Sequence, residues 1–246
     1  IMTDVQQRNP LVTSVSAFFP CYNDSMSIGK LVRDVRESLV EAVDDFEIIV
    51  VNDGSSDNSL EVLQGLQKEI TELIIVNHEM NRGYGGALLS GFSSSTKQWV
   101  FYTDGDAQYD AREISRCIAA VTESSDVIQG FKIGRGDPIH RRVIGRAYHH
   151  AVRFLFRLPV RDTDCDFRLI RNSVLHQVRL RSTTGVICVE MMHAFNRVNA
   201  NFVEVGVSHY HRPHGKSQFF RIPAISRSAL QLLQLWSRLM LRRSYD

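Results

Sequence analysis

The chain has 246 residues, 43% of them hydrophobic and 23% charged, so it can bury the core of one globular domain. It contains no run of about 18 apolar residues, and its first residues lack the basic flank and apolar core of a signal peptide, so we expect neither a membrane-spanning helix nor secretion. The net charge of +2 conceals an asymmetry: residues 1–125 carry 9 basic and 19 acidic side chains (net −10), and the remainder carries 20 and 8 (net +12), which favours an anionic partner for the second half.

Short apolar segments alternate with amphipathic segments along the first half of the chain. The patterns predict strands at residues 12–19, 46–51, 73–76, 99–103 and 127–131, and helices at 28–43, 60–70, 86–92 and 113–121. No repeat or Pro/Gly/Ser-rich linker divides the chain. The alternation predicts an α/β fold with a mainly parallel central sheet that carries helices on both faces.

Polar clusters follow four of the predicted strands, at Pro20–Asp24, Asn52–Asp57, Asn81–Gly86 and Asp104–Gln108. Ligands of open parallel sheets bind beyond the carboxyl ends of the strands. We therefore expect the four clusters to converge on one rim of the sheet and to form the functional site there.

The cluster after the fourth strand has the composition of a metal site. Asp104 and Asp106 flank one glycine, and Gln108 offers a further oxygen. Mg²⁺ and Mn²⁺ commonly take one or two carboxylates and complete their shell with water and phosphate oxygens. An Asp-Gly turn without a metal is the alternative interpretation.

Two other clusters have shapes suited to a nucleotide or a sugar. Asp53 ends a buried strand, where its carboxylate can accept hydrogen bonds from a base or ribose, although it can also belong to a turn before a helix. The glycine-rich loop from Asn81 to Gly86 precedes a helix, and a helix N-terminus favours phosphate. The loop is neither a Walker A motif nor G-x-G-x-x-G, which argues against a P-loop NTPase and a dinucleotide dehydrogenase.

In this order, the four clusters resemble the motifs of family 2 inverting glycosyltransferases, which have a GT-A fold. Asp162–Arg168, Glu190 and Arg212–Ser217 further resemble elements of the dolichyl-phosphate mannose synthase branch. That branch moves a sugar from a nucleotide diphosphate sugar to a polyprenyl phosphate. The resemblance implies the same reaction here, with a donor of GDP-mannose or UDP-glucose type, in a catalytic domain over residues 1–220.

The resemblance also implies roles for individual residues. Binding of the nucleotide sugar is expected from Pro20, Tyr22, Asp24, Asp53, Asn81, Gly83 and Asp104, and binding of Mg²⁺ or Mn²⁺ is expected from Asp104, Asp106 and Gln108. The expected catalytic residues are Asp106, Lys132, Arg142, Arg146, Arg168, Arg212 and Ser217. Of these, Lys132, Arg142 and Arg146 would receive the acceptor phosphate. Arg168, Arg212 and Ser217 would close over the donor phosphates.

Three residues depart from the family's pattern. Asp24 stands where glutamate is usual, Asp166 where glycine is usual, and Gln218 where lysine often follows the serine. If Asp166 faces the site, its carboxylate could select the donor sugar; a solvent-facing turn is the alternative. These departures concern the sugar and the acceptor more than the reaction class.

The type of acceptor decides which catalytic groups are needed. A phosphate acceptor is already anionic and needs cations to position it, which the basic segment 132–161 supplies unless those side chains form the polar face of a helix. A hydroxyl acceptor needs a general base, for which Asp162 and Glu190 are available. The alternative functions are therefore a family 2 glycosyltransferase acting on a hydroxyl, and a non-catalytic protein that binds a nucleotide sugar. No nucleic acid is expected, because aromatic residues do not alternate with the basic ones.

The last segment, residues 221–246, predicts a basic amphipathic helix. Its apolar residues recur at helical spacing over 224–243, with Trp236 among them. Such a helix either lies on an anionic membrane surface or docks on the domain core. The four cysteines occur singly, which favours a reducing compartment. We therefore expect a cytoplasmic protein that attaches peripherally to the cytoplasmic face of the membrane. A membrane protein or further copies of the chain in a homo-oligomer are the expected protein partners.

Overall fold

The computed structural model describes residues 8–133, 150–211 and 222–241. Within them, one seven-stranded sheet has the order β3-β2-β1-β4-β6-β5-β7. The strands are β1 (Ser14–Cys21), β2 (Asp45–Asp53), β3 (Leu73–His78), β4 (Trp99–Thr103), β5 (Val127–Ile133), β6 (Phe167–Arg171) and β7 (Phe202–Ser208). β6 runs antiparallel to β4 and β5, and the other neighbours are parallel. The predicted α/β fold with a mainly parallel sheet is confirmed.

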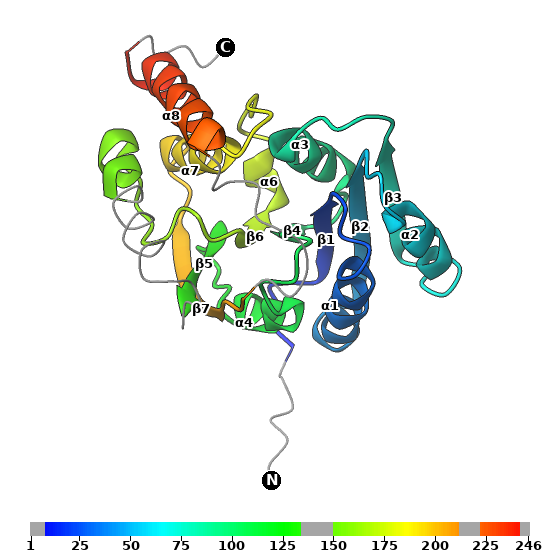
Figure 1. Cartoon of the computed structure of the whole chain (residues 1–246). Coiled ribbons are helices and arrows are strands. Elements are labelled where there is room, and N and C mark those ends of the chain that lie inside the picture. The colour runs from blue at the N-terminus through cyan, green and yellow to red at the C-terminus, as the bar shows by residue number, and fades with distance from the viewer. Residues whose placement is uncertain (1–7, 134–149, 212–221, 242–246) are drawn as a thin grey trace.

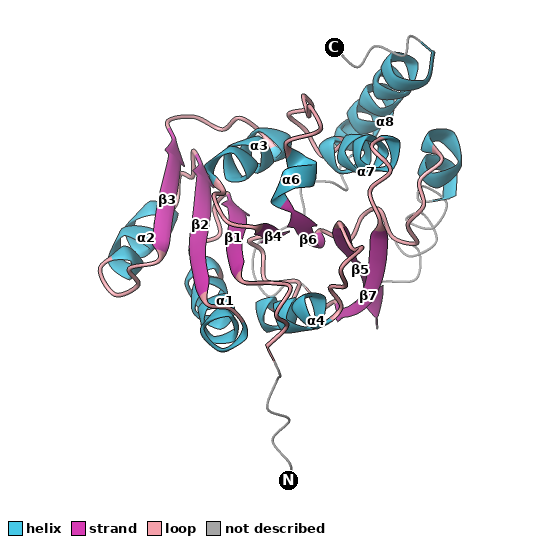
Figure 2. Ribbon diagram, turned by 180° about the vertical axis from the view of Figure 1, so that it is seen from behind, coloured by secondary structure: helices cyan, strands magenta, loops and turns pink. Residues whose placement is uncertain are grey.

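Helices cover both faces of the sheet (Figure 1). On one face lie α1 (Ile28–Ala42), α2 (Ser59–Gln67), the short turn η1 (Ala111–Glu113) and α4 (Ile114–Ala119). On the other lie α3 (Tyr84–Ser94), α6 (Asn172–Leu175), the helical segment 150–156, α7 (Ile187–Arg197), α8 (Ile222–Trp236) and the π-helical turn η2 (Ser237–Leu241). Figure 2 shows the same two layers from behind.

The central strands β1, β2 and β4 are largely apolar because both of their faces are buried. In β1, Phe19 packs with the helices of the first layer, whereas its neighbour Phe18 packs with those of the second. In β2, Val50 and Ile49 divide in the same way. Successive side chains of a strand point to opposite faces, so a sheet between two helical layers needs an unbroken apolar run.

The predicted elements of the first half agree with the structure to within a few residues, but four later elements were missed. β6, α6, α7 and β7 lie between residues 167 and 208, where no element was predicted. The predicted helix 113–121 begins as the 3₁₀ turn η1 and ends at Ala119. The observed boundaries of this helix thus differ from the predicted ones by about two residues, because its first turn is a 3₁₀ turn. The types of the predicted elements are confirmed.

The C-terminal helix docks on the second core with one side. Leu235 and Leu239 are 5% and 6% exposed, and Trp236 donates a hydrogen bond from Nε1 to the carbonyl oxygen of Leu155 at 3.2 Å. Leu230 and Leu233, in contrast, are exposed. Among the described residues, no helix combines the length and the apolar character needed to cross a membrane.

Candidate active site

The loops after β1, β2 and β4 meet at one rim of the sheet, as predicted. The side-chain oxygen Oδ1 of Asn23 accepts hydrogen bonds from the backbone N–H groups of Ser56 (2.8 Å) and Asp57 (3.3 Å). Ser27 Oγ donates to the carbonyl oxygen of Gly105 at 2.9 Å. Asn23 has a positive φ of 58°, which a short polar side chain tolerates. These contacts bind the three loops into one unit.

The first loop brings an exposed ring to this rim. Pro20 is buried at the end of β1, and Tyr22 is 41% exposed. Asp24 is half-buried, and its Oδ2 accepts the backbone N–H of Tyr22 at 3.3 Å. The Tyr22 ring is therefore placed at the rim by a loop whose backbone is fixed.

Asp53 is held from two directions. Its side chain is buried, and Oδ1 accepts the backbone N–H of Arg82 at 2.8 Å and lies 2.6 Å from His78 Nδ1. His78 Nε2 lies 2.8 Å from Ser90 Oγ on α3. Sequence reasoning missed His78, although its position at the end of β3 matches that of Asp53 at the end of β2. The two ends and α3 form one rigid polar network.

Two glycines of the loop Asn81–Gly86 lie against the backbone of a segment that is distant in the sequence. A Cβ atom at Gly85 would lie 2.2 Å from the carbonyl oxygen of Ser182, and one at Gly83 would lie 2.5 Å from that of Thr183. Gly85 N–H donates to the Thr183 oxygen at 3.0 Å. At this contact, the space that a side chain would take is filled by the backbone of residues 182–183. Asn81 is exposed beside the loop, and its Oδ1 accepts the N–H of Gly83 at 2.9 Å.

The two aspartates of the predicted metal site lie just beyond β4. Asp104 Oδ1 accepts a hydrogen bond from the hydroxyl of Tyr84 at 2.7 Å. Asp106 Oδ1 accepts the backbone N–H of Gln108 at 3.1 Å, and Gln108 Nε2 donates to the carbonyl oxygen of Tyr210 at 3.3 Å. Burial, together with the negative charges of Asp166 and Asp106, raises the pKa of Asp104 well above its usual range. The carboxyl groups of Asp104, Asp106 and Asp166 therefore lie close enough at this point of the rim to influence one another.

Asp166 faces this site and does not sit in a solvent-facing turn. Its Oδ1 accepts hydrogen bonds from Arg168 at 2.6 Å and from the thiol of Cys188 at 3.1 Å, and its side chain is 16% exposed. Its charge raises the pKa of Asp104, which places the two carboxylates near each other. The residue that replaces the family's usual glycine thus adds a third carboxylate beside the aspartate pair.

Arg168 lies behind the rim, within the protein. It is fully buried on β6, and its guanidinium donates to Asp166, to Gln129 Oε1 at 2.6 Å, to the carbonyl oxygen of Thr163 at 2.7 Å and to the hydroxyl of Tyr102. The guanidinium also lies 5.4 Å from the centroid of the Tyr102 ring. These contacts position Asp166, and they leave Arg168 without exposed surface.

Lys132 supplies positive charge near the aspartates. Its Nζ donates to the carbonyl oxygen of Asp164 at 2.7 Å, and its charge acts on Asp104. The two alternative bases differ in position: Asp162 Oδ2 accepts the backbone N–H of Lys132 at 3.4 Å, whereas Glu190 lies on α7. The predicted residues Arg142, Arg146, Arg212 and Ser217 lie outside the described residues.

Comparison with known proteins gives a consistent result. A family model described as Glycosyl transferase family 2 matches residues 16–179. The undecaprenyl-phosphate 4-deoxy-4-formamido-L-arabinose transferase of Pseudomonas aeruginosa (strain LESB58) is 29% identical over 222 residues, and that of Pseudomonas paraeruginosa (strain DSM 24068 / PA7) is 30% identical over 223 residues. Each match covers 90% of this chain and 62% of the relative, so the chain spans less than two thirds of these relatives.

Solved structures show the same fold. Glucosyl-3-phosphoglycerate synthase from Mycobacterium tuberculosis, in complex with phosphoglyceric acid, matches with a TM-score of 0.70 and 18% identity, over 92% of this chain and 80% of that one. The same enzyme with Mn²⁺, uridine diphosphate and glucosyl-3-phosphoglycerate matches over the same shares, with a TM-score of 0.69 and 18% identity. This likeness confirms the predicted GT-A fold.

Proposed function

Because the chain belongs to glycosyl transferase family 2, we propose that it moves a hexose, with inversion, from a nucleotide diphosphate sugar to a polyprenyl phosphate. The observation that carries the proposal is the Asp104–Asp106 pair at the end of β4, set among polar loops that are locked to one another. The names of the curated relatives, which refer to sugar transfer to undecaprenyl phosphate, support this acceptor.

In this proposal, the loops after β1, β2 and β3 bind the nucleotide sugar. The exposed ring of Tyr22 offers a stacking surface for a base, and the loop carrying Pro20 and Asp24 fixes its place. Asp53 and Asn81 line the next two strand ends. In this proposal the donor is of GDP-mannose or UDP-glucose type.

The aspartate pair fits Mg²⁺ or Mn²⁺. Among the described residues, no three acidic, histidine or cysteine side chains are arranged to enclose a metal by themselves, so the shell would combine Asp104, Asp106 and Gln108 with oxygens of the donor diphosphate. Burial, and after it the charges of Asp166 and Asp106, raises the pKa of Asp104, and a cation bound at this point would favour the ionised carboxylate. When bound, the ion offsets the charge that builds up on the departing diphosphate.

The acceptor phosphate attacks the anomeric carbon on the face opposite the nucleotide. A bond forms from a phosphate oxygen to that carbon. The bond from the same carbon to the diphosphate oxygen breaks, and the diphosphate leaves with the electron pair. The nucleophile is already an anion, so it needs placement by cations such as Lys132, with Arg142 and Arg146 as further proposed partners. In this proposal Arg168 acts through Asp166, whose carboxylate it fixes beside the reacting sugar.

We also propose that the chain works at the cytoplasmic face of the membrane as a peripheral protein. The exposed Leu230 and Leu233 on the outer side of α8 support such an attachment. A membrane partner or a homo-oligomer would serve the same purpose.

The decisive experiment incubates the purified chain with Mn²⁺, a polyprenyl phosphate and a panel of labelled GDP- and UDP-sugars, followed by extraction with organic solvent. Label that enters the solvent phase with one donor supports the proposal and identifies the sugar. Asp106→Ala should abolish this transfer while the far-ultraviolet circular dichroism is retained, and wild-type activity would contradict the metal role. Hydrolysis of the donor without lipid product would favour a hydroxyl acceptor, and binding without turnover would favour a non-catalytic protein.

A further inference from the structure

Helix α3 holds two aspartates that the proposed function assigns to different parts of the donor nucleotide. Asp104 accepts the hydroxyl of Tyr84, the first residue of the helix. Asp53 is linked to Ser90, farther along the helix, through His78: Nε2 of the ring lies 2.8 Å from Ser90 Oγ, and Nδ1 lies 2.6 Å from Asp53 Oδ1. At a rise of about 1.5 Å per residue, Tyr84 and Ser90 stand about 9 Å apart along the helix axis.

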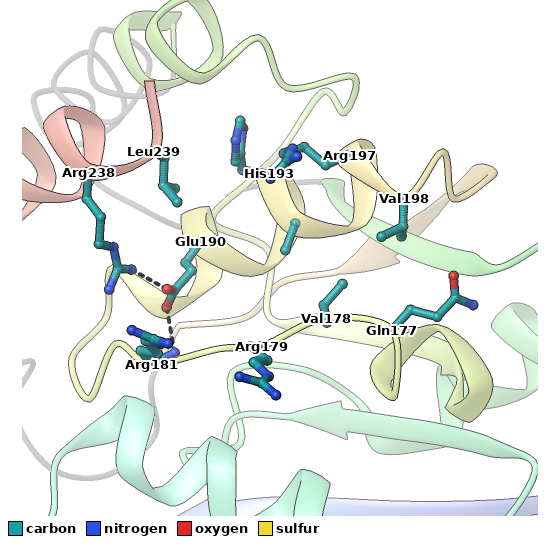
Figure 3. Close-up of a pocket in the computed structure, with 11 residues that line it drawn as sticks. Gln177, Val178, Arg179, Arg181, Glu190, His193, Arg197, Val198, Arg238 and Leu239 are labelled. Carbon is teal, nitrogen blue, oxygen red and sulfur yellow. Dashed lines mark hydrogen bonds and ion pairs between the residues drawn. The ribbon is translucent and has the colours of Figure 1, made fainter. Parts of the chain in front are cut away.

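The helix is itself fixed on two sides. Towards the sheet, a Cβ atom at Gly91 would lie 2.3 Å from a phenylalanine ring of β1, so the bare backbone of α3 packs directly on the strand. Towards α7, the N–H of Gly85 donates to the carbonyl oxygen of Thr183 at 3.0 Å. The carboxylate of Glu190 holds that segment by accepting the backbone N–H groups of residues 181 and 182 (Figure 3). The two aspartates are therefore attached to a rigid support.

In both aspartates, the protein donors occupy the same oxygen, Oδ1. Asp53 Oδ1 also accepts the N–H of Arg82 at 2.8 Å. An ionised carboxylate only accepts, so Nδ1 of His78 carries a proton whether the ring is neutral or charged. Within the described part of the chain, Oδ2 of Asp53 and Oδ2 of Asp104 form no hydrogen bond, and neither is among the enclosed side-chain oxygens that lack a partner. Asp53 is only 3% exposed, and that small exposed surface includes Oδ2.

The neighbour of Asp53 on β1 supplies an aromatic face. Cys21 pairs with Asn52 in the parallel register of β1 and β2, so the next residues, Tyr22 and Asp53, follow neighbouring strand positions at the rim. A base stacks on an aromatic ring with its face and forms hydrogen bonds with its edge. Uracil and guanine carry a ring N–H on that edge, which a carboxylate oxygen can accept. Cytosine and adenine carry a bare ring nitrogen at the same place, which only accepts.

We propose that His78, held by Ser90, and Tyr84 are positioning residues of the nucleotide site, an inference that rests on the proposed function. Each fixes Oδ1 of one aspartate and leaves Oδ2 to the ligand. Oδ2 of Asp53 accepts the ring N–H of uracil or guanine, and Oδ2 of Asp104 stays available for the divalent metal. Because one helix carries both contacts, the separation of the two oxygens is set before the nucleotide binds.

Calorimetric titration with nucleoside diphosphates and Mn²⁺, without sugar or acceptor, tests the orientation of Asp53. The wild type should bind UDP more tightly than CDP, or GDP more tightly than ADP, by about tenfold or more. In Asp53→Asn, the donors from His78 and Arg82 require the amide oxygen at the place of Oδ1. The amide N–H group then replaces Oδ2, and the preference should shift towards CDP or ADP. In Asp53→Asn/His78→Ala one of these donors is gone, so the shift should be smaller.

Two single variants separate the base from the diphosphate. His78→Ala should weaken the binding of UDP or GDP by about tenfold and leave the binding of pyrophosphate with Mn²⁺ unchanged. His78→Asn, whose amide N–H can donate in place of Nδ1, should restore part of the loss, and Ser90→Ala should have a smaller effect of the same kind. Tyr84→Phe should weaken pyrophosphate binding with Mn²⁺ and keep the preference between bases. The matched control is Ser93→Ala, which removes an exposed hydroxyl from the same helix and should change neither.

The outcomes distinguish this inference from the proposed function. Equal losses for nucleotide and pyrophosphate in His78→Ala would indicate a purely structural role and overturn the inference, as would a preference shift in Asp53→Asn that does not depend on His78. Sugar transfer to the lipid without these base-dependent effects would leave the proposed function intact. The base-dependent effects without transfer would support the positioning role and contradict the proposed acceptor. A wild type that binds no nucleoside diphosphate would contradict both.

Discussion

Replacing Arg168 with Met removes a fully buried guanidinium and leaves its partners in place. Asp166 would keep a largely buried negative charge, and the oxygens of Gln129 and Thr163 would lose their donors. Breaking a buried ion pair from one side costs about 3–5 kcal/mol, and the two unpaired acceptors place the expected loss at the upper end of this range. With a urea slope of roughly 3 kcal/mol per molar, the midpoint of unfolding should fall by more than about 1 M.

The assay is urea unfolding followed by tryptophan fluorescence, with Arg33→Met as the control. Arg33 pairs with Glu69 at 3.4 Å, but both side chains are mostly exposed, so its loss should cost about 0–1 kcal/mol. Adding Asp166→Asn to Arg168→Met removes the stranded charge and should restore part of the stability. If Arg168→Met and Arg33→Met shifted the midpoint equally, the argument that Arg168 serves to hold Asp166 would fail.

Three further predictions concern stability. Gly85→Ala should lower the free energy of unfolding by about 1–3 kcal/mol, because its Cβ would lie 2.2 Å from a backbone oxygen. Gly65→Ala, with nothing within 4 Å of the new Cβ, should raise the free energy of unfolding by about 0.5–1 kcal/mol through its helix. Equal effects of the two substitutions in thermal unfolding would contradict the contact at Gly85. Burial raises the pKa of Asp164 from 3.8 to about 6, so the native state holds the proton more tightly than the unfolded state. The free energy of unfolding should therefore fall as the pH rises from about 4 to about 6. Asp164→Asn should flatten that part of the profile, and an unchanged slope would count against the shift. Leu235→Ala should lower the free energy of unfolding by about 2–4 kcal/mol, whereas Leu233→Ala should hardly change it, because only Leu235 is buried. Similar losses for the two variants in urea unfolding would argue that α8 does not dock as described.

The first half of the fold could be predicted because β1, β2 and β4 are nearly continuous apolar runs buried on both faces. β6 escaped prediction for a physical reason: its sequence places Arg168 in the middle of a five-residue strand, and an arginine is buried only where tertiary partners surround it. Those partners, Gln129 and Tyr102, come from other strands. No local pattern could have shown them.

The candidate site was predicted at the level of loops more accurately than at the level of single side chains. The convergence of the strand ends follows from parallel topology alone, which the alternation of elements revealed. The roles of Arg168 and Gly85 depend on what lies next to them, and for both the neighbour is distant in the sequence. His78 was missed because a histidine at a strand end does not indicate a polar network by itself. Its role follows only from its contacts with Asp53 and Ser90, which the sequence does not show to be its neighbours.

The contact between Gly85 and the backbone of residues 182–183 also constrains how this sequence can diverge. A larger residue at position 85 requires the 182–183 segment to stand farther from α3, and that segment is held by Glu190, which in turn pairs with Arg238. Substitutions at these sites should therefore arise together rather than singly. In a sufficiently deep set of related sequences, positions 85, 190 and 238 are expected to covary, although they lie on three separate elements of the chain.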